Sequence, residues 1–214
     1  MKKNLTELVL ILDRSGSMCG LESDTIGGFN SMLAKQKQEP GDCRITTVLF
    51  DHRYELLHDR IDIRGVSPMT EKEYYVAGST ALLDAIGKTI HKIGTAQKNT
   101  APEYRADKVL FVIITDGYEN SSRFYTAEQV KAQIRHQQER YGWEFLFLGA
   151  NIDAVETASR FGIRADHAAD YVPDGEGTRL NYEVMSSAIS SYRSCGAMPQ
   201  DALDGIRRDH KKRS

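Results

Sequence analysis

Three short, nearly continuous apolar runs constrain the fold of this chain more than any other feature. They occupy residues 5–13 (LTELVLILD), 108–116 (KVLFVIITD) and 143–149 (WEFLFLG), and all three are rich in β-branched or aromatic residues. Apolar runs of this length without alternation are typical of strands buried on both faces, as in a parallel sheet. The sequence therefore predicts a sheet with a covering layer on each side.

Segments with helical patterns separate these runs. Residues 81–98 place their apolar side chains on one stripe, and residues 126–140 begin with a capping-box pattern, Thr-Ala-Glu-Gln. Residues 153–161 predict a shorter helix with Asp153 as its N-cap. Strands that alternate with helices imply right-handed crossovers, so we expect a doubly wound α/β fold.

A hairpin is predicted at one edge of this sheet. Residues 43–50 (CRITTVLF) have the composition of a strand, and residues 54–63 follow so closely that the two form an antiparallel pair. The intervening Asp51 is interpreted as a turn residue.

The character of the chain changes after residue 170. A loop is expected at 174–177, followed by an amphipathic helix at about 180–195 and a polar tail that frays. We therefore predict one domain over residues 1–165 and a C-terminal extension over residues 166–214.

Composition excludes several classes of protein. The 28 Lys and Arg residues nearly balance the 30 Asp and Glu residues, and 40% of the chain is hydrophobic. These values are ordinary for a soluble globular protein and give no reason to expect a nucleic-acid partner. No stretch approaches the roughly 20 apolar residues of a membrane helix, and the run after the basic start at residues 1–4 is too short for a signal peptide. We expect no membrane partner.

The cysteines indicate the compartment. Cys19, Cys43 and Cys195 are odd in number and widely spaced, without a CxxC pair. This spacing argues against a disulfide framework or a structural zinc site. We predict a cytoplasmic protein with reduced thiols.

Oxygen-bearing side chains gather at the ends of two predicted strands. The first run ends in DRSGS (13–17), another ends in TDG (115–117), and GSTAL (78–82) opens the helix between them. In an open α/β sheet, ligands bind outside the carboxyl ends of the strands, where the strand order reverses. If these two strands are neighbours at that reversal, all three segments reach one crevice.

Five residues of these segments form a candidate metal site, and all of them offer oxygen: Asp13, Ser15, Ser17, Thr80 and Asp116. Alternate side chains of an extended segment point the same way, which brings the first three toward one point. An all-oxygen set suits a hard cation such as Mg²⁺.

The three segments resemble the parts of the metal-ion-dependent adhesion site of a von Willebrand factor type A domain. That family's pattern, DxSxS with a separate Thr and a separate Asp, is present here without substitution, and the resemblance covers residues 4–161. It implies a doubly wound, Rossmann-like α/β fold. The sheet would be six-stranded and mostly parallel, with one antiparallel edge strand and helices on both faces.

The resemblance also implies a role for each residue. Ser15 and Ser17 would contact the metal through their hydroxyls, and Thr80 would join them when the site is competent to bind its ligand. Asp13 and Asp116 would act through ordered waters and hydrogen bonds.

The function implied is binding rather than catalysis. An acidic side chain of a partner protein would complete the coordination of Mg²⁺, with Mn²⁺ or Ca²⁺ as alternatives. Because neutral hydroxyls leave the ion most of its positive charge, an incoming carboxylate is favoured. We further expect Tyr118, Glu119, Asn151 and Asp153 at the rim, where they are available to the partner, although Asp153 also suits a helix cap.

A Mg²⁺-dependent phosphotransferase of haloacid-dehalogenase type is the alternative. Such enzymes use a DxD pair after a buried strand, with the second Asp as general acid. Here Ser15 stands at that position, and a serine cannot act as a general acid near neutral pH. The downstream segment ITDGYEN supplies only Asp116 and Glu119 as acids.

Overall fold

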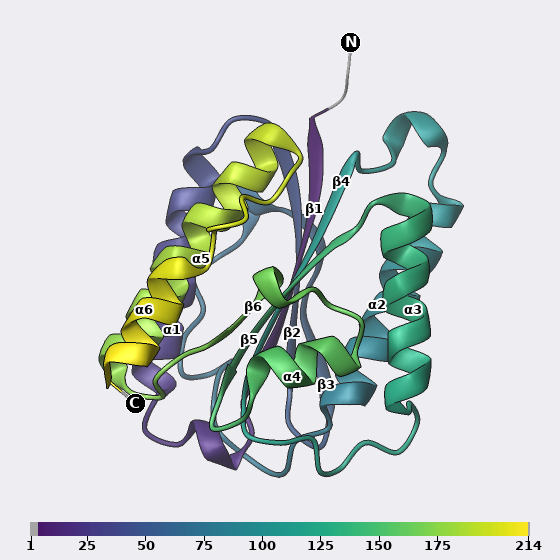
Figure 1. Ribbon diagram of the computed structural model, residues 1–214. Helices are drawn as coiled ribbons and strands as arrows, with labels where there is room; N and C mark the ends of the chain where they lie inside the picture. Colours follow the sequence, from purple (N-terminus) through teal and green to yellow (C-terminus); the bar gives the residue numbers. More distant parts are fainter. Residues whose placement is uncertain (1–3, 214) are drawn as a thin grey trace.

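The computed structural model describes residues 4–213, which contain one six-stranded sheet (Figure 1). The order of the strands across the sheet is β3-β2-β1-β4-β5-β6. The strands are β1 (Leu5–Asp13), β2 (Asp42–Phe50), β3 (Tyr54–Asp62), β4 (Lys108–Asp116), β5 (Glu144–Ala150) and β6 (Ala168–Asp170). The helices are α1 (Glu22–Gln38), α2 (Leu82–Asn99), α3 (Ala127–Tyr141), α4 (Ala154–Arg160), α5 (Gly175–Cys195) and α6 (Asp204–Arg213).

The topology confirms the predicted fold class. Strands β1, β2, β4, β5 and β6 are parallel, and only the edge strand β3 runs antiparallel, paired with β2. After β3 the chain crosses back to the other side of β1, so the strand order reverses between β1 and β4. This reversal is the place where an open α/β sheet binds its ligands.

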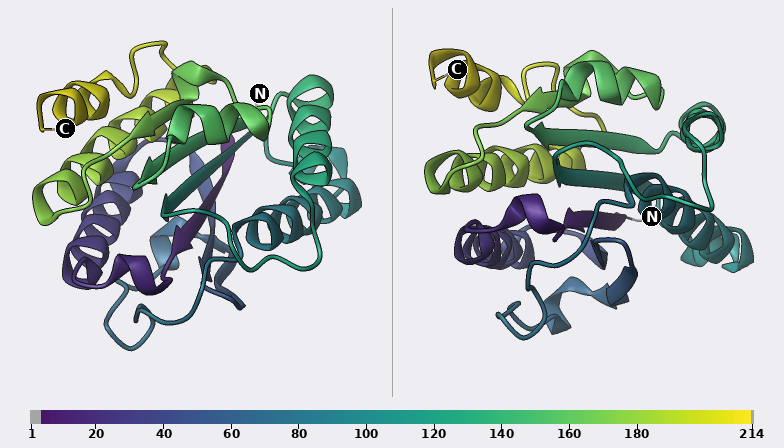
Figure 2. Two further views of the ribbon diagram at one scale, coloured as in Figure 1. Left: turned by 60° about the horizontal axis from the view of Figure 1, so that its bottom comes forward. Right: turned by 90° about the horizontal axis from the view of Figure 1, so that it is seen from below.

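Each face of the sheet carries its own apolar core. Along β1, the side chains of Leu8, Leu10 and Leu12 join the core under α1 and α5, whereas Val9 and Ile11 join the core under α2, α3 and α4. This alternation follows from the two-residue period of a strand. Figure 2 shows the helices in two layers on either side of the sheet.

Two predicted helix starts are confirmed in atomic detail. At the start of α3, the Thr126 side chain accepts a hydrogen bond from the Gln129 amide, and the Gln129 side chain accepts one from the Thr126 amide. Asp153 caps α4 by accepting a hydrogen bond from the Glu156 amide, at 2.7 Å. No helix within residues 4–213 is long and apolar enough to cross a membrane.

The C-terminal residues were predicted to be an extension, but they complete the main domain. Strand β6 is the sixth strand of the sheet, and α5 covers one face of the sheet beside α1. The residues expected to form a loop at 174–177 instead start α5, because Asp174 caps it by accepting a hydrogen bond from the Gly177 amide.

The tail expected to fray contains the packed helix α6. Leu203 and Ile206 are buried in the same core as α5, so the tail has apolar anchors that the surrounding charges hide in the sequence. Residues 1–3 and 214 of the predicted ranges 1–165 and 166–214 lie outside the described residues.

Candidate metal site

The predicted oxygen cluster forms at the carboxyl edge of the sheet. The adjacency of β1 and β4 places Asp13 and Asp116 at one edge, and the segment before α2 brings Thr80 to them. The Ser15 hydroxyl oxygen lies 3.1 Å from that of Ser17 and 3.0 Å from that of Thr80. Two segments that are distant in sequence thus present three hydroxyls at one point, and the end of β4 adds Asp116.

Asp13 positions the segments that carry this cluster by accepting hydrogen bonds from them. It is buried, and its Oδ1 accepts a 2.7 Å hydrogen bond from the Ser15 amide. Its Oδ2 accepts bonds from the Thr115 hydroxyl at 2.7 Å and the Asp116 amide at 3.2 Å. Because both carboxylate oxygens are engaged, Asp13 orients the loop after β1 and fastens it to β4.

Asp116 is oriented by a residue that was expected at the rim. The Asn151 side-chain amide donates a 2.6 Å hydrogen bond to Asp116 Oδ1. Asn151 has a φ of +54°, in the left-handed region that Asn adopts more readily than most residues. The Ser17 hydroxyl donates to the Asp116 backbone carbonyl, which joins the β1 and β4 segments again.

Backbone hydrogen bonds fix the segment that carries Thr80. The Gly16 amide donates to the Gly78 carbonyl at 3.0 Å, and the Asn120 side chain accepts from the Thr80 amide at 2.9 Å. Gly78 has a φ of +71°, and a Cβ there would lie 2.0 Å from His52 Nδ1. Only glycine fits this position, so the turn before Thr80 is tightly specified.

The charges of the two site carboxylates are left without a basic partner. Burial raises the pKa of both Asp13 and Asp116, and the hydrogen bonds they accept offset this rise in part. Among residues 4–213, no Lys, Arg or His forms an ion pair with either. A nearby cation would lower both pKa values and compensate the buried charge.

Arg14, the one basic residue of the DRSGS segment, pairs with carboxylates outside the metal site. Arg14 is buried, with Nε 3.3 Å from Asp51 Oδ2 and Nη1 2.8 Å from Glu55 Oε2. Asp51 lies in the turn between β2 and β3, as interpreted from the sequence, and its Oδ1 accepts a 2.6 Å hydrogen bond from the Arg53 amide. It is also fully buried, and its carbonyl accepts a hydrogen bond from the Ala81 amide. Nothing in the sequence distinguishes this buried Asp from an ordinary turn residue.

The other three residues predicted for the rim differ in whether a partner protein can reach their side chains. Tyr118 is 66% exposed, as expected of a residue that a partner can reach. The Glu119 carboxylate instead accepts hydrogen bonds from the amides of Leu83, Ser121 and Ser122, so it caps the start of α2. Asp153 is engaged as the cap of α4.

The donor set fits a hard divalent cation. No cluster of three or more His, Cys, Asp and Glu within residues 4–213 could hold a metal ion. The cluster described above differs in kind, because three of its five members are hydroxyls and only two are carboxylates. Uncharged and anionic oxygens together are the ligands that Mg²⁺, Mn²⁺ and Ca²⁺ take in proteins.

No protein-family model matches the sequence, and no curated protein matches it. Solved structures match its fold. A von Willebrand factor type A protein from Catenulispora acidiphila aligns with a TM-score of 0.59 at 15% identity, over 88% of this chain and 43% of that one. The manganese-loaded TRAP protein of Plasmodium vivax aligns with a TM-score of 0.60 at 19% identity, over 83% of this chain and 72% of that one.

A third structure is proximal thread matrix protein 1 from the mussel byssus, with a zinc-occupied MIDAS motif. It aligns with a TM-score of 0.56 at 14% identity, over 86% of this chain and 46% of that one. The chain therefore spans less than half the length of the Catenulispora and mussel proteins. These alignments establish that it has the fold of von Willebrand factor type A domains.

Proposed function

We propose that this chain is a protein-binding module whose binding depends on a divalent cation. The observation that carries the proposal is the meeting of three hydroxyls beside two buried carboxylates, which no basic side chain of residues 4–213 neutralises. Ser15, Ser17 and Thr80 would hold the ion through neutral oxygens, and Mg²⁺ is the ion proposed for the cell. Mn²⁺ and Ca²⁺ take the same kinds of ligand.

The bound ion would supply positive charge for an acidic partner. Neutral hydroxyl ligands leave most of the ion's charge uncompensated, and a carboxylate from outside is then attracted to it. The negative charges of Asp13 and Asp116 would stabilise the ion, and the hydrogen bonds that both carboxylates accept hold them in place. We therefore propose a partner protein that offers an Asp or Glu side chain to the ion, rather than a nucleic acid or a membrane.

Two of the similar structures support a divalent cation here. The Plasmodium vivax protein is manganese-loaded, and the mussel protein has a zinc-occupied MIDAS motif. Both share the fold of this chain. The DxSxS, Thr and Asp positions of the chain supply a comparable all-oxygen set at the carboxyl edge of the sheet.

The arrangement of Asp13 favours binding over phosphotransfer. A nucleophilic carboxylate must be reached by its substrate, but Asp13 is buried and its oxygens accept three hydrogen bonds from within the protein. Ser15 stands where a phosphotransferase of haloacid-dehalogenase type has its general acid. We also propose that the module works in the reducing cytoplasm, where its three free cysteines remain thiols.

A cation-controlled binding experiment tests this function. The full chain is immobilised, exposed to lysate of its native cells with Mg²⁺, and eluted with a chelator. We expect specific proteins in the eluate for the wild type and for Ser79→Ala, which removes a neighbouring hydroxyl outside the site. The same proteins should be absent for Thr80→Ala and Asp116→Ala. Equal recovery with a chelator present throughout contradicts the proposal.

A further inference from the structure

Two aromatic side chains project from the loop that joins β4 to α3, next to the metal site. This loop comprises residues 117–126, and it leaves Tyr118 66% exposed and Phe124 82% exposed. Phe124 is the most exposed large hydrophobic residue within residues 4–213. Aromatic side chains are enriched where proteins bind one another, so the loop is a candidate for contact with a partner protein.

The loop is joined to the metal site at two places. At its start, Gly117 has a φ of +95°, and a Cβ there would lie 3.6 Å from Ser17 Oγ. The chain therefore passes close to the Ser17 hydroxyl immediately before Tyr118. Further along, the amides of residues 120–121 donate hydrogen bonds to the Thr80 carbonyl at 3.0 and 3.2 Å. Tyr118 thus lies between contacts with two of the proposed metal ligands.

The backbone that carries Phe124 is fixed by hydrogen bonds. Asp84, in the first turn of α2, accepts bonds from the three consecutive amides of residues 123–125, at 2.8 to 2.9 Å. The ring of Tyr125 packs so closely on α2 that a Cβ on Gly87 would lie 2.4 Å from it. Because this backbone is already ordered, a partner that contacts Phe124 does not have to order it, and such preorganisation favours affinity.

The hydroxyls of the metal site are less accessible than these two aromatic side chains. Ser15 and Thr80 are buried, and Ser17 is the exposed member of the three. A carboxylate from outside would therefore approach the ion from the side of Ser17, where the loop begins. The segment that carries this carboxylate must project from its own protein and pass beside Tyr118.

The area of an ordinary protein interface includes both aromatic residues. Such an interface covers about 800 Å² on each partner, which is a circle of about 16 Å radius. Phe124 is bonded to Asp84, four residues after Thr80 in the chain, which places it about 10–15 Å from the ion. A partner centred on the ion would thus cover Tyr118 and reach Phe124.

We propose that Tyr118 and Phe124 select the partner of the metal site, and that this partner presents an Asp or Glu flanked by large apolar side chains. The carboxylate would pass Ser17 and complete the coordination of the cation, and the apolar neighbours would cover the two rings. An acidic segment without apolar residues would leave both rings in water and lose this contribution. The inference rests on the function proposed for the metal site.

Random twelve-residue peptides displayed on phage are the probe. The full chain is immobilised with Mg²⁺, and the bound phage are eluted with a chelator and sequenced. We expect the peptides to share an Asp or Glu with a large apolar residue within about four positions, since an extended chain advances roughly 3.3 Å per residue. Acidic peptides without this apolar residue would overturn the inference and leave the proposed function intact. Failure to elute any peptide with the chelator would contradict both.

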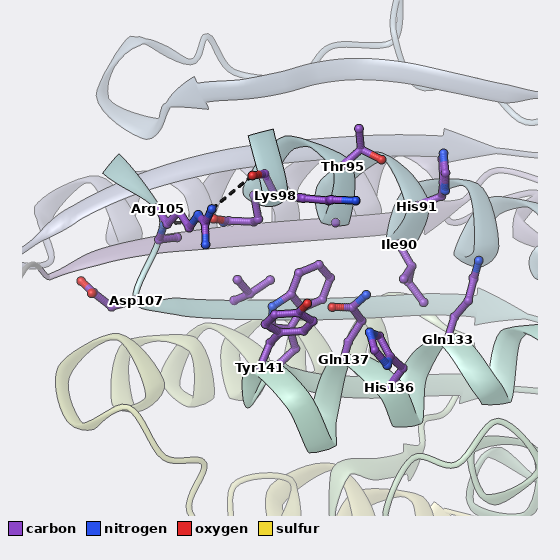
Figure 3. Close-up of a pocket in the computed structure, with 15 residues that line it drawn as sticks. Ile90, His91, Thr95, Lys98, Arg105, Asp107, Gln133, His136, Gln137 and Tyr141 are labelled. Atoms are coloured by element: carbon purple, nitrogen blue, oxygen red, sulfur yellow. Dashed lines mark hydrogen bonds between the residues drawn. The ribbon is translucent and has the colours of Figure 1, made fainter. Parts of the chain in front are cut away.

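Three variants locate the apolar contact, measured with the most enriched peptide in synthetic form. Tyr118→Ala and Phe124→Ala should each bind it at least about tenfold more weakly than the wild type, with unchanged affinity for Mg²⁺. Tyr141→Ala is the matched control, because Tyr141 is 59% exposed at the end of α3, beside the groove between α2 and α3 (Figure 3) and at the opposite edge of the sheet. We expect no change for this control. Equal peptide affinity in all three variants contradicts the assignment.

Discussion

At the scale of single residues, side-chain hydrogen bonds decide how the site is held. The five predicted metal-site residues meet because strand ends bring them together, which a sequence can indicate. The bond from Asn151 to Asp116 depends on a side-chain conformation, so the same sequence led us to expect Asn151 at the rim. Glu119 was placed there for the same reason, although its carboxylate caps α2.

Asn151→Gly tests the orienting role of this bond. Glycine accepts the left-handed φ of +54° without strain, so we expect the loss of thermal stability to be limited to that of the missing hydrogen bond. Loss of a hydrogen bond to a charged group should weaken metal binding by about 1.5 kcal/mol, or roughly tenfold. Calorimetric titration with Mg²⁺ or Mn²⁺ measures this. Unchanged affinity would remove Asn151 from the site.

His58 predicts a pH dependence of stability. Burial lowers its pKa below the ordinary value of about 6.5, while the charge of Glu73 acts in the opposite direction. The unfolded chain therefore binds a proton more readily than the folded chain. The stability contributed by neutral His58 is complete above pH 6.5 and is lost as the pH falls below it. We expect Tm to fall less in His58→Gln than in the wild type between pH 7 and about 5.5. Parallel curves would exclude this contribution.

At the scale of elements, the apolar strands could be predicted from the sequence because strands buried on both faces have continuous apolar runs. Helix α1 was missed because the stripe it buries includes Gly28 and Gln36 as well as apolar residues. Gln36 can be buried there because its side-chain amide donates a 2.9 Å hydrogen bond to the Ser186 carbonyl of α5. A reading based on apolar periodicity does not detect an interface built from small and polar residues.

Gly28 and Gly27 form a matched pair for this interface. A Cβ on Gly28 would lie 2.4 Å from the Tyr182 ring of α5, whereas a Cβ on Gly27 meets nothing within 4 Å. We expect Gly28→Ala to destabilise the fold by about 1–3 kcal/mol through overpacking. Gly27→Ala should stabilise it by about 0.5–1 kcal/mol, because alanine favours a helix. Denaturant unfolding measures both, and equal effects would contradict the close packing of α1 on α5.

Leu203, which anchors α6 in the core, provides a second test at the scale of elements. Leu203 is fully buried in the core under α5, and Asp201 just before it is exposed. Leu203→Ala should cost about 2–5 kcal/mol of unfolding free energy, and Asp201→Ala less than about 0.5 kcal/mol. A frayed tail would tolerate both substitutions equally.

At the scale of the whole molecule, the topology brings together charges that are far apart in the sequence. The carboxyl edge of the sheet holds two buried carboxylates that one cation can compensate. The net charge of −2 conceals this cluster. The sequence revealed it through its motif, because the ends of β1 and β4 carry the two carboxylates.

The location of a bound cation tests the central claim most directly. Crystals of the full chain soaked in Mn²⁺ are measured by anomalous diffraction. We predict one strong peak between the hydroxyl oxygens of Ser15, Ser17 and Thr80, at about 2.1–2.2 Å from the oxygens that coordinate it. No peak at saturating Mn²⁺, or a peak away from these three hydroxyls, would contradict the account.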